Sequence, residues 1–268
     1  MKYVKLIKTI EEIAPLELAP LWDNSGVQIY TGQEEIERVL ICLDITEEVI
    51  KEAENKKTGM IITHHPLIFD SIKKIDTDQV TGRYVCRLIK AGICVYSAHL
   101  TFDNAREGNN FYMAKLLGME NLKTAAKERP GEGSKDPAEL PSGMTGQLCR
   151  QMTPEEAASH IINALEIPQD GIRMVKGKNT IKKIGLCTGA GGDFLDYTIR
   201  EGCELFITGD VKLHEAQRAK AEGISLIDAG HYGTEHIFAE NFARQLKEKA
   251  GKELEIIEST VDTDPFML

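Results

Sequence analysis

Two adjacent histidines, His64 and His65, stand at the end of an apolar run in the segment MIITHHPLIF, residues 60–69. The β-branched residues of this run favour a buried strand, and Pro66 ends it because proline cannot continue a hydrogen-bonded ladder. Successive side chains of a strand point to opposite faces, so two histidines that both do chemistry are better placed to serve two centres than to chelate one ion. A polar pair at the edge of a sheet is the alternative interpretation of this dipeptide.

Two further histidines end predicted strands, and each is followed four residues later by an acidic residue. His99 precedes Asp103 in GICVYSAHLTFD, and His231 precedes Glu235 in GISLIDAGHYGTE. In open α/β sheets ligands bind beyond the carboxyl ends of the strands, so these side chains are expected at that edge. Imidazole and carboxylate donors together suit divalent zinc, iron, manganese or nickel, whereas the lack of thiolates argues against a structural zinc site.

Weaker signals leave alternatives open. The segment TGAGGD at 188–193 follows a predicted strand and opens a helix, so its amides either hold an anion or form a tight turn without a ligand. Trp22 follows a predicted helix and is either a packing anchor or a substrate platform. His214 opens a predicted helix and is a further candidate for the site, while His236 is predicted to be a packed or surface helix residue.

The composition of the chain bounds its class. The chain has 268 residues, of which 42% are hydrophobic and 28% are charged, as is ordinary for a soluble globular protein. The net charge of −10 argues against direct nucleic-acid binding, because contacts to a phosphate backbone need an excess of Lys and Arg. We expect no membrane association, since no run approaches a membrane span and the N-terminus MKYVKLIKTIEE lacks the apolar stretch of a signal peptide. Six scattered cysteines without a CxxC pair predict reduced thiols and a cytoplasmic protein.

The elements that must position these residues are predicted to form two similar α/β lobes related by pseudo-symmetry. Residues 38–65 and 183–210 both run strand, helix, strand, and a histidine–acid end follows in each half, which favours duplication over chance similarity. Such units predict α/β layers with largely parallel strands. A Pro- and Gly-rich segment at 127–143 is predicted to link an N-terminal lobe, 1–126, to a C-terminal lobe, 144–268. Helices are predicted at 79–90, 154–165 and 232–249.

Six short motifs occur along the chain in order: LWDNSGVQI, ITHHPLIF, SAHLTFD, GDVKLHEA, IDAGHYGTE and TDPF. Together they resemble the GTP cyclohydrolase 1 type 2 homologues, also known as the NIF-three-like family, from Trp22 to Phe266. The resemblance implies the NIF-three-like fold and a ring-shaped homohexamer. Longer members carry an inserted domain between the lobes, where this chain has only the predicted linker, so it resembles the short form. The family's usual HTNLD reads HLTFD here, a departure that keeps the carboxylate.

The resemblance also implies a site for two divalent metal ions per chain, with His64, His65, Asp103, His231 and Glu235 as ligands. Combined with the alternation of side chains along a strand, it assigns His65 and Asp103 to one ion, and His64 and His231 to the other. Glu235 would bridge the two ions, because a carboxylate can bind two cations and an imidazole nitrogen cannot.

His99 is not a ligand in the family pattern, and we predict a catalytic role for it, either as support for the ligands or as a proton shuttle. The leading functional hypothesis is a two-metal hydrolase of a small molecule, such as a nucleotide or another heterocycle, in which the ions activate water. The family name suggests hydrolytic ring opening of GTP, but the sequence contains no guanine-specific contact that we can identify, and fold and metal site together do not specify chemistry. The alternative is a metal-containing scaffold or regulatory binding protein without catalysis.

Overall fold

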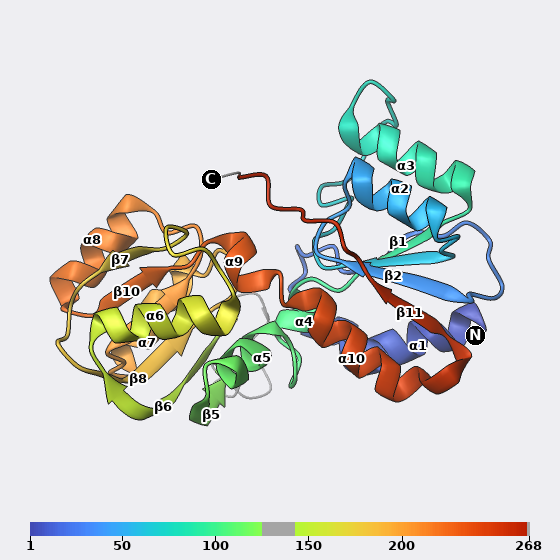
Figure 1. Ribbon diagram of the computed structural model, residues 1–268. Coiled ribbons are helices and arrows are strands. Elements are labelled where there is room, and N and C mark those ends of the chain that lie inside the picture. The colour runs from blue at the N-terminus through green and yellow to red at the C-terminus, as the bar shows by residue number, and fades with distance from the viewer. Residues whose placement is uncertain (125–142, 267–268) are drawn as a thin grey trace. The chain divides into compact units, whose positions relative to one another are not determined.

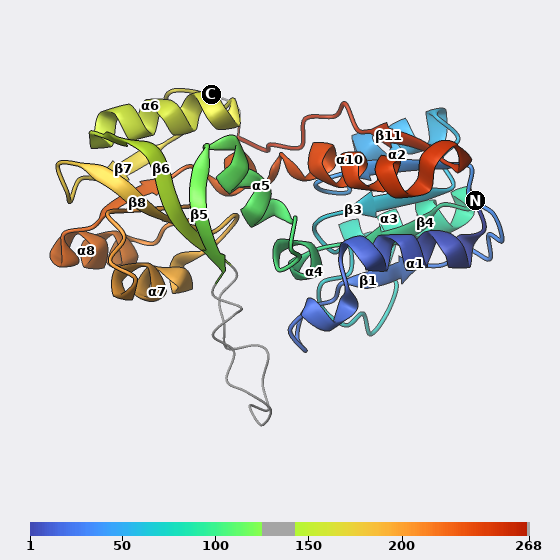
Figure 2. The same ribbon diagram turned by 90° about the horizontal axis from the view of Figure 1, so that it is seen from below.

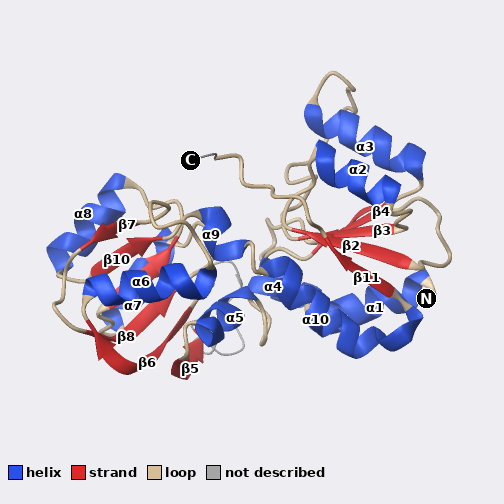
Figure 3. Cartoon of the chain, viewed as in Figure 1, coloured by secondary structure: helices blue, strands red, loops and turns tan. Residues whose placement is uncertain are grey.

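The computed structural model describes residues 1–124 and 143–266. The chain forms two compact units: unit 1 combines Met1–Ala105 with Phe238–Leu268, and unit 2 is Arg106–Ile237. Each unit has one β-sheet with helices packed on it, as Figures 1 and 3 show. The predicted α/β fold class is therefore confirmed.

Unit 1 has a five-stranded sheet, whose strands are β1 (Gly26–Ile29), β2 (Arg38–Cys42), β3 (Met60–Thr63), β4 (Cys94–Ser97) and β11 (Glu255–Glu258). Its main helices are α1 (Tyr3–Ile13), α2 (Glu47–Asn55), α3 (Val80–Ala91) and α10 (Phe238–Ala250), with the short α4 (Leu100–Asp103) and the 3₁₀ turns Leu16–Leu18 and Gly251–Glu253. The strand order is β1-β4-β3-β2-β11, and all neighbours are parallel except the edge strand β1. Helices α2 and α3 cover one face of the sheet, and α1 and α10 cover the other (Figure 1).

Unit 2 has a six-stranded sheet, whose strands are β5 (Met119–Thr124), β6 (Met144–Met152), β7 (Arg173–Val175), β8 (Ile181–Leu186), β9 (Leu205–Thr208) and β10 (Ser225–Asp228). Its helices are α5 (Asn109–Leu116), α6 (Pro154–Leu165), α7 (Leu195–Arg200), α8 (Leu213–Glu222) and α9 (His231–Glu235), with a 3₁₀ turn at Gly192–Phe194. The order is β5-β6-β8-β9-β10-β7, in which β8, β9 and β10 are parallel and the others pair antiparallel. Helices α5 and α6 lie on one face, and α7 and α8 on the other (Figure 2).

Local signals start and end the helices as predicted. The Thr153 hydroxyl accepts from the Glu156 amide (3.2 Å) and the Glu156 carboxylate accepts from the Thr153 amide (2.7 Å), so a capping box opens α6. Gly92 ends α3 with φ of 70°, a left-handed conformation that glycine adopts without strain. The helices predicted at 79–90 and 154–165 are confirmed to within one residue. Across the described residues we find no helix with the length and apolar character needed to cross a membrane.

The single helix predicted over 232–249 is wrong. Two helices, α9 and α10, occupy this stretch, and His236 and Ile237 separate them. The chain passes from unit 2 to unit 1 at this break. Phe238 and Phe242 of α10 are fully buried in unit 1, so the two helices pack in different units, which helix propensity alone does not reveal.

The two halves of the chain repeat one order of elements. The series α1, β1, β2, α2, β3, α3, β4 corresponds to α6, β7, β8, α7, β9, α8, β10, and the strands take corresponding places, β1-β4-β3-β2 and β7-β10-β9-β8. Each series then continues into a short helix, α4 or α9, and ends in a helix and a strand that belong to the other unit. Helix α5 and strand β5 are part of unit 2, while α10 and β11 are part of unit 1. The pseudo-symmetry is therefore present, with the last two elements exchanged.

This exchange separates the observed units from the predicted lobes, 1–126 and 144–268. The lobes assume that each repeat packs upon itself, whereas the structure pairs β11 with β2 and β5 with β6. The predicted linker, 127–143, lies outside the described residues except for Gly143. Sequence similarity between the repeats reveals the duplication. It does not show in which unit the last helix and strand of each repeat pack.

The parallel strands explain how distant residues gather. Strands β3, β4, β9 and β10 are buried along their whole length, as expected for strands covered by helices on both faces. Their carboxyl ends lie at one edge of each sheet. Residues 64–65 and 98–103 follow that edge in unit 1, and residues 209–210 and 229–235 follow it in unit 2.

Candidate metal centre

Three histidines cluster at the carboxyl edge of the unit 1 sheet. His64 and His65 directly follow β3, and His99 follows β4. The ring centroid of His64 lies 5.0 Å from that of His65 and 5.2 Å from that of His99, and the His65 and His99 centroids are 5.7 Å apart. Each ring offers a nitrogen that lies within 4.8 Å of the others, so the three residues could hold a metal ion. The strand ends at Thr63, earlier than the end predicted at Pro66, and His99 lies beside the His64–His65 pair as expected.

Each ring of this cluster is oriented through its Nδ1 atom. His64 Nδ1 donates to the Ala98 carbonyl (2.9 Å), and His65 Nδ1 lies 2.8 Å from the Asp44 carboxylate. His99 Nδ1 lies 2.6 Å from Asp23 Oδ1. A carbonyl and a carboxylate can only accept, so the proton sits on Nδ1 and the lone pair on Nε2. This is the tautomer that metal-ligating histidines adopt, with a hydrogen-bond acceptor behind the ring.

Asp103 lies beside His64. Its Oδ2 is 3.6 Å from His64 Nε2, and both side chains are buried. The His64 ring also packs on Phe238, with centroids 4.9 Å apart, which holds the imidazole against an apolar wall. The contact of Oδ2 with Nε2 makes His64 a neighbour of Asp103, while the assignment of His65 and Asp103 to one ion stays a prediction. Both histidines follow the end of β3 at Thr63, so the alternation of side chains along a strand does not settle how the two rings are directed.

Unit 2 has a histidine–carboxylate pair of its own on α9. His231 and Glu235 lie one helical turn apart, and His231 Nε2 is 3.0 Å from Glu235 Oε2. His231 Nδ1 lies 2.8 Å from Asp210, which follows β9 with φ of 53°. The Glu235 side chain is almost completely buried. The same arrangement recurs here, because an acceptor holds Nδ1 and Nε2 stands next to a carboxylate oxygen.

Gly189 leaves the space that the Glu235 carboxylate fills. A Cβ atom on Gly189 would lie 2.2 Å from Glu235 Oε1 and 3.2 Å from His231 Nε2. The surrounding amides have internal acceptors: that of Thr188 donates to Asn110, that of Gly189 to Thr234, and that of Gly191 to Thr208. The segment 188–193 is therefore a turn that supports Glu235, and these three amides are not directed at an anion.

We expect Gly189→Ala to weaken divalent-metal binding about tenfold or more, because the new methyl group must displace the Glu235 carboxylate. Isothermal titration with zinc or manganese would measure this. Gly223→Ala is the matched control, since its φ of 70° imposes the same backbone strain and its Cβ would contact nothing within 4 Å. Equal affinity in Gly189→Ala and Gly223→Ala would contradict the role given to Gly189.

The sequence pattern of the Duf34/NIF3 family (NGG1p interacting factor 3) matches residues 1–265. The chain belongs to this family. The Clostridium perfringens member named GTP cyclohydrolase 1 type 2 homolog is 34% identical over 267 residues, which cover 99% of both chains. The solved structure of Staphylococcus aureus protein SA1388 is 28% identical, with a TM-score of 0.87, over 100% of this chain and 99% of that one.

One Duf34/NIF3 relative shows the difference in length between members. The Bacillus subtilis protein, also named GTP cyclohydrolase 1 type 2 homolog, is 26% identical over 365 aligned positions that cover 98% of this chain and 97% of that one. That alignment is longer than the 268 residues of this chain, so the relative carries residues that this chain lacks. The predicted family and its short form are confirmed.

Sequence reasoning missed the acceptors behind the histidines. Asp44 follows β2, Asp210 follows β9, and Asp23 stands in the WDN motif of the N-terminal segment. All three lie in motifs or at strand ends, which is the signal that could have found them. Asp23 is the most enclosed. Burial alone would raise the pKa of its carboxyl, but hydrogen bonds from His99 and Ser25 outweigh burial and hold this pKa below its usual value.

Two other histidines of unit 2 lie outside the His231–Glu235 pair. His214 on α8 is largely exposed, and its Nε2 lies 3.9 Å from the Glu215 carboxylate. His236 stacks on Tyr232 with centroids 5.6 Å apart, and its Nδ1 lies 3.2 Å from the Tyr232 carbonyl. His236 is thus a packed helix-end residue, as predicted, and the candidacy of His214 gains no support from these contacts.

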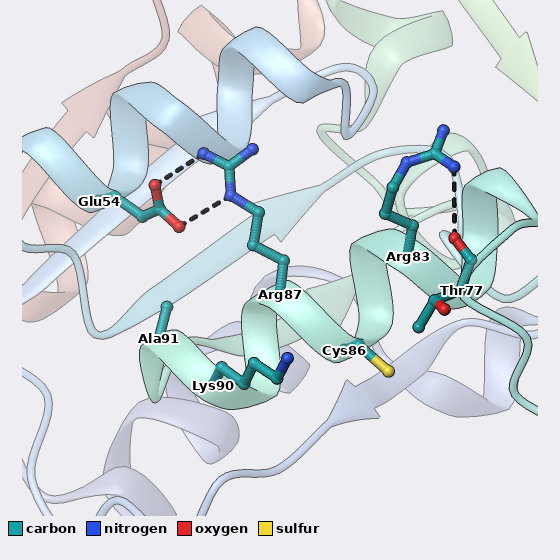
Figure 4. A pocket seen from close by; sticks show the side chains of 7 residues that line it. All are labelled: Glu54, Thr77, Arg83, Cys86, Arg87, Lys90 and Ala91. Atoms are coloured by element: carbon teal, nitrogen blue, oxygen red, sulfur yellow. Dashed lines mark hydrogen bonds and ion pairs between the residues drawn. The ribbon is translucent and has the colours of Figure 1, made fainter.

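Unit 1 has a pocket of about 590 Å³ that is lined by none of the candidate metal ligands. Its wall is formed by Glu54, Thr77, Arg83, Cys86, Arg87, Lys90 and Ala91 (Figure 4). Arg87 binds Glu54 through two hydrogen bonds, of 2.9 and 2.7 Å, and Arg83 donates to the Thr77 carbonyl. These guanidinium groups are already engaged by protein acceptors. The pocket lacks every histidine of the candidate centre, so it is a separate feature of the α2–α3 layer.

Proposed function

We propose that this protein binds two divalent metal ions and uses them to hydrolyse a small molecule. The observation that supports this most strongly is the shared orientation of four histidines: His64, His65, His99 and His231 each have Nδ1 against an acceptor. Metal-ligating histidines commonly hold one ring nitrogen against such an acceptor and leave the other nitrogen for the ion. The donors are nitrogen and carboxylate oxygen without thiolate, which fits zinc, iron, manganese or nickel.

We assign the ligands from the contacts within each unit. His64 and Asp103 would hold one ion, because their ligand atoms are neighbours, and His65 would hold the other. His231 and Glu235 would complete the centre, with the buried Glu235 carboxylate shared by the two ions. When bound, such ions polarise the substrate and make water a nucleophile near neutral pH.

Within this centre, we assign to His99 the transfer of a proton during hydrolysis. Its Nδ1 is fixed by the Asp23 carboxylate, which also accepts from Ser25. A pKa below its usual value keeps Asp23 ionised, so its carboxylate can hold Nδ1 while Nε2 stays directed at the site. The remaining orienting groups, Asp44 and Asp210, would hold ligand rings rather than carry protons.

The proposed substrate is a nucleotide or another heterocycle. This follows from the name GTP cyclohydrolase 1 type 2 homolog that relatives carry. The family description, NGG1p interacting factor 3, instead suggests the alternative function, a scaffold without catalysis. Elemental analysis of protein purified without chelator or metal-affinity tag, followed by a panel of nucleotides and esters, tests both. We expect about two ions per chain and turnover above that of free metal. Metal without turnover on any panel member would favour the scaffold.

His64→Ala should remove one of the two ions. The ion held by His64 and Asp103 loses its imidazole, while the ligands of the other ion remain, so about one metal per chain should be left. Inductively coupled plasma measurements on purified protein would show it, with thermal unfolding to confirm the fold. His214→Ala is the control, because that ring is exposed and outside the centre. Full occupancy in His64→Ala would rule out His64 as a ligand.

The proposal also includes the cellular location, the substrate class and the oligomeric state of the protein. A cytoplasmic location is supported by six cysteines that are all free thiols. The net charge of −10 supports a small-molecule substrate over nucleic acid. A homohexamer, which the resemblance implies, remains part of the proposal.

A further inference from the structure

We propose that Trp22 and Phe69 form a stacking platform for a planar heteroaromatic ring beside His99. The inference rests on the proposed function, since it assigns the substrate class of the same site. It concerns two aromatic side chains of unit 1 that the metal chemistry does not use.

Both aromatic side chains are exposed where packing would normally bury them. Trp22 is 57% exposed and Phe69 is 49% exposed, although they come from segments far apart in the chain. Their ring centroids lie 6.4 Å apart at an angle of 56°. Of the two interpretations of Trp22, packing anchor and substrate platform, its exposure favours the second. Two aromatic rings that meet and stay open to solvent present apolar π-faces to a ligand.

Hydrogen bonds hold the two segments together and so fix the platform. The Asn24 side chain donates to the Ile68 carbonyl, and the Ile68 amide donates to the Gln28 side chain (3.1 Å). Gln28 in turn donates to the Asn24 carbonyl (2.6 Å). These hydrogen bonds join the segment that carries Trp22 to the segment that carries Phe69. The two backbones are therefore held in place without relying on the contact between the two rings.

The platform is joined to the histidine cluster on both sides. The Phe69 ring meets His99 edge to face, with centroids 6.3 Å apart. Trp22 is followed by Asp23, whose fully buried side chain binds His99 Nδ1. A ring stacked on the platform would therefore lie next to the group that we propose to move the proton. Stacking accepts any flat ring, so the ligand class is a nucleobase or similar heterocycle rather than an aliphatic ester.

Trp22 is the sole tryptophan of the chain, so its fluorescence reports on this place alone. The full-length protein, freed of metal by chelator, is titrated with guanosine 5′-monophosphate and separately with ribose 5-phosphate. We expect saturable quenching by the nucleotide and none by the sugar phosphate. In Phe69→Leu the apparent Kd should rise about tenfold, the size of one lost stacking contact. Tyr30→Leu, which removes another exposed aromatic ring, should bind as the parent does.

Three outcomes would overturn the platform: quenching by the sugar phosphate as strong as by the nucleotide, no saturable quenching, or an unchanged Kd in Phe69→Leu. Light scattering of Trp22→Leu adds a fourth, because loss of assembly in this variant would make the aromatic pair a contact between copies of the chain. The metal-free titration separates the two proposals. If metal-free protein binds the nucleotide but metal-loaded protein shows no turnover, the hydrolase proposal is wrong and the platform proposal stands. If metal-loaded protein turns over the substrate equally well with and without Phe69→Leu, the platform proposal is wrong and the hydrolase proposal stands.

Discussion

Glu235→Gln should lower the metal content from about two ions per chain towards none, which is the largest effect expected of a single substitution here. The amide keeps the volume of the buried side chain and removes its charge. If Glu235 is shared, each ion loses an anionic oxygen and then faces the unscreened repulsion of its neighbour. His231, whose Nε2 lies 3.0 Å from this carboxylate, cannot compensate, because an imidazole carries no negative charge.

The control for Glu235→Gln is Glu215→Gln, the same chemical change elsewhere in unit 2. Glu215 accepts a hydrogen bond from the Lys212 amide at the start of α8 and is not part of the candidate centre. Metal per chain, measured by inductively coupled plasma analysis, should be unchanged in this variant. One ion retained by Glu235→Gln would mean that Glu235 serves a single ion, and two retained ions would remove it from the ligand set.

His99→Ala should leave both metals in place and lower any hydrolytic turnover by about a hundredfold or more, the usual contribution of a positioned acid or base. The physical reason is the bond of 2.6 Å between His99 Nδ1 and the ionised Asp23, which prepares Nε2 to take up a proton. Steady-state kinetics of the metal-loaded variant, together with its metal content, would measure both quantities.

His160→Ala provides the comparison for His99→Ala, because its Nε2 lies 2.9 Å from the Leu117 carbonyl and it is part of the unit 2 fold. Turnover per folded molecule should be unchanged in that variant. A large loss of metal in His99→Ala would assign this ring to the ligands, since its nitrogen lies within 4.8 Å of those of His64 and His65. Unchanged turnover with both metals present would exclude proton transfer by His99.

Much of the candidate site follows from the sequence because it depends on local features. Pro66 and the apolar run before it determine where β3 ends, and the strand end determines where His64 and His65 stand. His99 and His231 follow the same rule, since a parallel sheet collects the carboxyl ends of its strands at one edge. Duplication was also visible, because repeated sequence yields repeated order of elements.

Only the tertiary structure decided which partners these residues have. The acceptors behind the rings, Asp44 for His65 and Asp23 for His99, stand 21 and 76 positions away, and strand order rather than sequence brings them close. Asp103 on α4 lies beside His64, which follows the end of β3, and neither segment alone records this contact.

The exchange of terminal elements has the same origin. By itself, the sequence determined a helical stretch within 232–249, since periodicity is a property of a segment, but it did not separate α9 from α10. The units in which α10 and β11 pack are set by tertiary contacts, since β11 pairs in parallel with β2, while β5 pairs antiparallel with β6, a strand without a counterpart in the unit 1 sheet. Such a choice depends on the free energy of the whole fold, and no local pattern records it.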